Sequence, residues 1–151
     1  MKDLNQKLEN IDARIIHGMR RLSMPAARTA LFIVFFWFGI LKVFGLSPAN
    51  PLVKALLEHT LPFMSFGTFS VVLGVFEMII GTSFLFKGLE RFAIALLVPH
   101  MIMTILPLIL LPTVTWQAAF VPTIEGQYII KNLVIISLAL GIAAHLHPLK
   151  K

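Results

Sequence analysis

Residues 66–86 read FGTFSVVLGVFEMIIGTSFLF, and Glu77 is the one charged side chain in this run. The hydrocarbon core of a bilayer is about 30 Å thick, and an α-helix needs roughly 20 apolar residues to cross it. The run lacks strict alternation and is about twice as long as a transmembrane strand. It therefore predicts a transmembrane α-helix.

Three further runs have the same character, and they cover residues 26–46, 92–111 and 128–146. In the whole chain of 151 residues, 58% are hydrophobic and 13% are charged, whereas a soluble domain carries about 25% charged residues. A domain of this size could not hide so much apolar surface from water. We therefore expect an all-α, four-helix transmembrane bundle whose surrounding partner is the lipid bilayer.

The first 24 residues differ from the rest because they are polar and basic. Apolar side chains recur in them every three or four positions, which predicts a helix with one apolar stripe: Leu4, Leu8, Ile11, Ile15, Met19 and Leu22. Arg14, Arg20 and Arg21 accompany the stripe. We expect residues 1–24 to form an amphipathic interfacial helix on the cytoplasmic lipid surface. The alternative is a solvated arm that packs on a partner.

Lysine and arginine gather at one end of the expected bundle. Six of them precede or begin the first span, Lys87 and Arg91 lie in the turn after the second, and residues 148–151 form a basic tail. The first loop at the opposite end holds only Lys54, and the second holds none. The positive-inside rule then places both termini in the cytoplasm, with residues 25–147 as the membrane domain.

The composition also excludes several classes of function. The net charge is +6, but the basic residues sit at the ends of apolar runs and are not interleaved with aromatics in a polar segment, so no nucleic-acid partner is expected. The chain has no cysteine, which excludes disulfides, iron–sulfur clusters and thiolate metal sites. We find no nucleophile–base pair, phosphate loop or zinc triad, and we predict no metal site.

Charged residues inside the spans are the candidates for chemistry, because an unpaired charge in hydrocarbon costs several kcal/mol. At 1.5 Å per residue, Lys42 and Lys131 are expected at a depth of roughly 6 Å from the outer side, and Glu77 at roughly 16 Å. A functional interpretation groups all three around an outward-opening pocket that binds a quinone or small anion, or that handles protons. In the alternative interpretation, both lysines reach up to the interface and Glu77 only hydrogen-bonds a neighbouring helix.

His100 is a further candidate because it lies near the middle of the third span, after Pro99, which is expected to kink the helix. A lone histidine in a span is more often a hydrogen-bonding group between helices than a metal or haem ligand. Gly74 and Gly81 lie on the same helical face as Glu77, and small residues mark close helix packing. We therefore expect Glu77 to face the interior of the bundle.

Three segments resemble the DoxX-like superfamily of four-helix membrane proteins: IVFFWFGILKVFG at Ile33–Gly45, LGVFEMIIG at Leu73–Gly81 and EGQYIIKNLVII at Glu125–Ile136. Within it, the chain is most similar to the bacterial inner-membrane group that includes a reactive-chlorine-resistance protein. The resemblance covers most of residues 26–146. Asn132 is a further candidate site residue; it stands where close relatives can carry Asp, which argues against a second carboxylate at this position.

The resemblance implies a bacterial inner-membrane protein linked to redox or oxidative-stress metabolism. We expect its polar site to bind a quinone or small anion, and its expected partners are further copies of the chain or a membrane redox protein. Two other functions stay open on the residues alone. The chain is also interpretable as a small oligomeric permease, or as a non-catalytic subunit that anchors a partner through residues 1–24.

Overall fold

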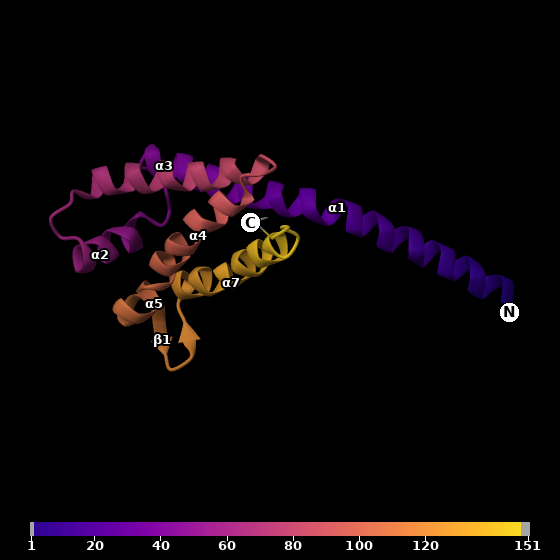
Figure 1. Ribbon diagram of the computed structural model, residues 1–151. Coiled ribbons are helices and arrows are strands. Elements are labelled where there is room, and N and C mark those ends of the chain that lie inside the picture. Colours follow the sequence, from indigo (N-terminus) through magenta and orange to yellow (C-terminus); the bar gives the residue numbers. More distant parts are fainter. Residues whose placement is uncertain (1, 149–151) are drawn as a thin grey trace.

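The computed structural model describes residues 2–148, and four of its helices are long and apolar enough to cross a membrane (Figure 1). The spanning elements are α1 (Lys2–Val43), α3 (Phe66–Leu85), α4 (Glu90–Ile105) with its continuation α5 (Pro107–Leu110), and α7 (Ile124–Ala143). The predicted all-α architecture is confirmed, and the chain is a multi-pass membrane protein.

The connections between the spans contain short elements. Helix α2 (Asn50–Thr60) has a proline, Pro51, in its first turn. Helix α6 (Pro112–Thr115) leads into a small hairpin of β1 (Trp116–Ala118) and β2 (Val121–Pro122), paired antiparallel. This hairpin is not among the elements predicted from the sequence. Its turn contains Phe120, which has a φ of 60° and is 95% exposed.

The ends of two spans differ from the expected boundaries. The fourth helix begins at Ile124, four residues before the predicted start, because the Thr123 side chain accepts a hydrogen bond from the Gly126 N–H at 3.1 Å and caps the helix. Because polar residues follow Thr123, hydropathy alone does not predict this first turn as part of the span. The third span continues through Pro99, but it is interrupted before Pro107, where α4 ends and α5 begins.

Helix α1 is one continuous helix of 42 residues and contains Pro25 in its interior. The predicted amphipathic helix is therefore the N-terminal half of α1, and it is joined without a break to the first span. Pro25 removes a single hydrogen bond, and the alanines that follow favour helix. A helix of this length measures about 63 Å, twice the hydrocarbon thickness, and its N-terminal half extends away from the other helices (Figure 1).

Glycines bring α1 and α3 into close antiparallel contact. A Cβ atom added to Gly39 would lie 2.5 Å from the carbonyl oxygen of Gly74, and one added to Gly74 would lie 2.6 Å from the carbonyl oxygen of Gly39. Two turns further along α3, a Cβ on Gly81 would lie 2.9 Å from the backbone nitrogen of Phe36. The predicted packing role of Gly74 and Gly81 is confirmed, since only hydrogen fits at each crossing point.

The apolar core occupies the half of the bundle next to the turn between α3 and α4. All four spanning helices contribute to it: Leu31, Phe35, Ile80, Phe84, Ala93, Leu97, Met101, Ala139 and Ile142. At the end of this core, the Arg28 guanidinium forms an ion pair with Glu90. The second oxygen of Glu90 accepts the Gly88 N–H at 2.7 Å. This contact ties α1 to the start of α4.

The glycine crossing yields a stability prediction. Gly74→Ala should lower the free energy of unfolding by roughly 1–3 kcal/mol, because the added methyl group meets backbone that cannot rotate away. Gly141→Ala is the matched control, since a Cβ there meets nothing within 4 Å and alanine favours helix. Unfolding of the two purified variants in mixed micelles measures both free energies. Equal stability of the two variants would contradict the close contact.

A buried lysine, glutamate and histidine cluster as the candidate functional site

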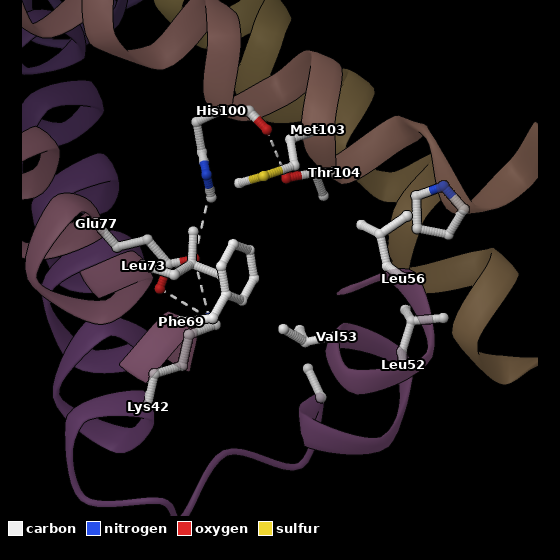
Figure 2. A pocket seen from close by; sticks show the side chains of 12 residues that line it. Lys42, Leu52, Val53, Leu56, Phe69, Leu73, Glu77, His100, Met103 and Thr104 are labelled. Atoms are coloured by element: carbon white, nitrogen blue, oxygen red, sulfur yellow. Dashed lines mark hydrogen bonds and ion pairs between the residues drawn. The ribbon is translucent and has the colours of Figure 1, made fainter. Parts of the chain in front are cut away.

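Three polar side chains from three helices meet inside the bundle (Figure 2). The Lys42 Nζ on α1 donates to both carboxylate oxygens of Glu77 on α3, at 2.7 and 2.9 Å. The His100 Nε2 on α4 lies 3.4 Å from the Glu77 Oε1. All three residues are buried, with exposed fractions of 5–8%. The sequence prediction that Glu77 faces the interior is confirmed.

The glycine crossing places the ion pair. Lys42 follows Gly39 by three residues and Glu77 follows Gly74 by three, so each charged side chain lies one helical turn from the point of closest approach. The Ser70 hydroxyl on α3 also donates to the carbonyl oxygen of Lys42 at 3.1 Å. These contacts fix the two backbones at a separation that a direct lysine–carboxylate bond can bridge.

Aromatic rings hold His100 in place. Phe35 and Phe76 contact its ring edge-on, with centroid distances of 5.3 and 6.2 Å. The His100 Nε2 is further from the carboxylate than the usual 2.7–3.2 Å of an N–H···O bond, and its Nδ1 is buried with no hydrogen-bond partner among the described residues. The imidazole is therefore well positioned but incompletely hydrogen-bonded.

A cavity of about 120 Å³ adjoins the cluster, and Lys42, Glu77 and His100 form its polar wall. The remaining lining is mostly apolar and comes from α2 and the residue before it, from the N-terminal part of α3, from the end of α4 and from the start of α5: Ala49, Leu52, Val53, Leu56, Phe69, Leu73, Met103, Thr104 and Pro107. Figure 2 shows the α2 side chains Val53, Leu52 and Leu56 across the cavity from Glu77. The site is thus a small apolar chamber with one polar side.

Two predicted site residues do not join the cluster. Lys131 is exposed on α7, and its Nζ lies 5.0 Å from the centroid of the Tyr128 ring, a cation–π contact. Asn132 is partly buried on the same helix and does not line the cavity. The expected grouping of Lys42, Glu77 and Lys131 is therefore replaced by Lys42, Glu77 and His100.

The cluster offers hydrogen bonds but no metal site. Among residues 5–148, whose side chains the structure describes, no group of three or more His, Cys, Asp or Glu could hold a metal ion. An ammonium has three donors, and Lys42 gives two of them to Glu77. The cluster can therefore present one ammonium N–H and one imidazole to the cavity, while the ion pair keeps its own charge balanced.

Compared with known proteins, the chain matches no protein-family model, no curated protein and no solved structure. The function is therefore inferred from the site itself.

The ion pair predicts a non-additive effect on stability. Lys42→Met should destabilise the protein by about 3–5 kcal/mol, because it leaves the Glu77 carboxylate buried without its partner. The double variant Lys42→Met with Glu77→Leu should recover most of this loss, since apolar side chains replace buried pairs at little cost.

Lys131→Met is the matched control, because it removes an equivalent charge from an exposed position in a span. It should change the unfolding free energy by less than about 1 kcal/mol. Chemical unfolding in micelles measures the unfolding free energy of all three variants. If the double variant lost as much stability as Lys42→Met or more, Lys42 and Glu77 would not stabilise each other.

Proposed function

We propose that this chain binds a small neutral ligand with carbonyl oxygens, a quinone head group, in the cavity beside Lys42, Glu77 and His100, and that it serves redox or oxidative-stress metabolism in a bacterial inner membrane. The observation that carries this proposal is the position of a buried ion pair and an imidazole on the wall of a cavity within a membrane bundle. Buried charges in spanning helices mark functional sites because they are costly to keep there.

The charge balance favours a neutral ligand over an anion. An anion that approached the Lys42 ammonium would also meet the Glu77 carboxylate, which contacts that ammonium through both oxygens. Like charges at this distance repel strongly in a medium of low dielectric constant. A carbonyl oxygen accepts the third ammonium proton without this penalty. Of the two predicted ligand classes, the quinone therefore fits better than the small anion.

The size and lining of the cavity agree with a single ring. Sites for drug-sized molecules measure about 300–1,000 Å³, whereas this cavity holds about 120 Å³. A head group fits such a volume, and a hydrophobic tail would extend into the surrounding lipid. Phe69 and Leu73 supply an apolar wall against which the ring can pack.

His100 supports the same ligand chemistry. Its Nδ1 has no hydrogen-bond partner among the described residues, and a buried polar atom without a partner costs about 1–3 kcal/mol. A ligand hydroxyl, as in a reduced quinone, would give this imidazole a partner. The same imidazole lies 3.4 Å from Glu77, so a proton taken from the ligand has a carboxylate beside it.

The cellular part of the proposal rests on the sequence. The resemblance to the DoxX-like superfamily includes the segments that carry Lys42 and Glu77, and this supports a link to redox metabolism. The distribution of lysine and arginine supports a topology with both termini in the cytoplasm. In this topology the cavity lies in the outer half of the bundle, because α2 lines it and the turn between α3 and α4 lies at the other end.

The topology can be tested by labelling, because the natural chain has no cysteine that would react. Phe63→Cys and Phe120→Cys lie at exposed positions in the two outer loops, and each should react with a membrane-impermeant maleimide added to intact cells. Lys87→Cys, in the turn between α3 and α4, should react only after the cells are opened. The reverse pattern would invert the proposed orientation.

Ligand binding can be tested on purified protein in nanodiscs with a short-tailed benzoquinone. The parent protein should bind it and gain thermal stability. The double variant Lys42→Met with Glu77→Leu should lose affinity by about 10–100-fold, which corresponds to a hydrogen bond to a charged group of about 1.5–3 kcal/mol. Isothermal calorimetry measures the affinities.

Lys131→Met serves again as the control and should bind the quinone like the parent protein, since its side chain lies outside the cavity. In cells exposed to an oxidant, the double variant should give less protection than Lys131→Met at equal expression. The quinone proposal fails if the parent binds chloride or acetate but not the quinone, or if both variants bind the quinone equally.

A further inference from the structure

The N-terminal half of α1 carries an apolar stripe that no other described part of the chain covers. The side chains of Leu8, Ile11, Ile15 and Leu22 are 53–66% exposed. All residues from 5 to 22 are exposed, because this part of α1 extends away from the other helices (Figure 1). The stripe is regular and lies along one side of a helix. It is separate from the cavity of the proposed function, so the two can be tested independently.

The continuity of α1 determines where this stripe lies. The Arg28–Glu90 pair and the turn between α3 and α4 are at the same end of the bundle, and charged groups of this kind lie at the boundary of the hydrocarbon. Residues 5–22 precede this boundary on an unbroken helix. They extend the first span beyond the hydrocarbon, so the stripe lies outside the membrane core.

The spacing of the stripe is that of a coiled-coil seam. Leu8, Ile15 and Leu22 are seven residues apart, and Ile11 and Gly18 occupy the alternate positions between them. Met19, the other member of the stripe in this stretch, lies beside Gly18 at the edge of the seam and is 66% exposed. This alternation of three and four residues places Leu8, Ile15 and Leu22 at the first position of each heptad and Ile11 at the fourth. Such a seam buries its apolar side chains against a second helix with the same repeat.

The charges beside the stripe differ between its two sides. Lys7, Arg14 and Arg21 follow one side at seven-residue intervals, whereas Asp12 occupies the corresponding place on the other side. A helix that lies on anionic lipid is rich in Lys and Arg on its polar face, whereas here an acidic residue borders one side of the stripe. In a parallel pair of identical helices, each Lys7 faces the Asp12 of the other copy, because residues five apart meet across the seam.

We propose that the N-terminal half of α1 pairs with the same segment of a second copy as a short parallel coiled coil, which makes the protein a dimer on the cytoplasmic side. The membrane supports this arrangement, because two copies inserted in the same direction present their N-terminal helices side by side and parallel. The apolar stripe is then covered by its own counterpart, and Lys7 of each copy faces Asp12 of the other.

Cysteine cross-linking tests this pairing directly, since the natural chain has no cysteine. Ile11→Cys lies in the seam and should form a disulfide-linked dimer when membranes are treated with a mild oxidant. Ala13→Cys is the matched control on the outer side of the same helical turn, and it should stay monomeric. Both positions are exposed in the single chain, so neither substitution should affect folding of the bundle.

The charge pair provides a second, independent measurement. Lys7→Glu alone should reduce cross-linking through Ile11→Cys several-fold, because it places Glu against Asp12 of the other copy. Adding Asp12→Lys should restore the dimer. Equal cross-linking at positions 11 and 13, or no rescue by the exchanged pair, would overturn the proposal. The proposal would also fail if lipid protected the cysteine at position 11 from maleimide while no dimer formed. That result would show that the helix lies on the bilayer.

Discussion

A charged side chain within hydrocarbon needs a partner at bonding distance, and this requirement organises the bundle around Lys42 and Glu77. Their direct contact at 2.7–2.9 Å demands that α1 and α3 approach closely enough for a lysine and a glutamate to meet. Gly39 and Gly74 permit this approach, because each places its backbone against the carbonyl oxygen of the other. The close packing of the two helices and the ion pair therefore depend on each other. On each helix the glycine and the charged residue are one helical turn apart.

The cluster also divides the bundle into two unlike halves. Toward the turn between α3 and α4, side chains from four helices fill the interior, and Leu31, Ile80 and Phe84 are almost completely buried. Beyond Glu77 the filling is less complete, and a cavity lies between α2, α3 and α4. A tightly packed half holds the helices in register, while the other half has room for a ligand. Because the polar groups lie at the junction, they are held by the packed half and accessible from the open one.

Much of this structure could be predicted from the sequence, and the failures have a common physical cause. Hydropathy located all four spans, and the depth of Glu77 together with the flanking glycines predicted that it faces inward. Depth alone does not give the direction in which a side chain points around its helix. Lys131 was therefore grouped with Glu77, although the structure places it on the outer side of α7 beside Tyr128. His100 has the depth and the direction, but a single histidine does not reveal its neighbour before the helices are packed.

The length of α1 shows a second limit of local patterns. The change from polar to apolar composition near Pro25 resembles a boundary between two elements, yet the helix continues through it. A proline removes one backbone hydrogen bond, and near the membrane surface water can satisfy the carbonyl oxygen that loses its donor. The composition therefore changes at the membrane surface, where the surroundings change from water to lipid, while the backbone remains helical. The Arg28–Glu90 pair lies three residues beyond Pro25, and there it fixes the direction in which the helix leaves the bundle. The polar half of α1 is accordingly a rigid extension of a spanning helix, so its apolar stripe is oriented by the membrane domain below it.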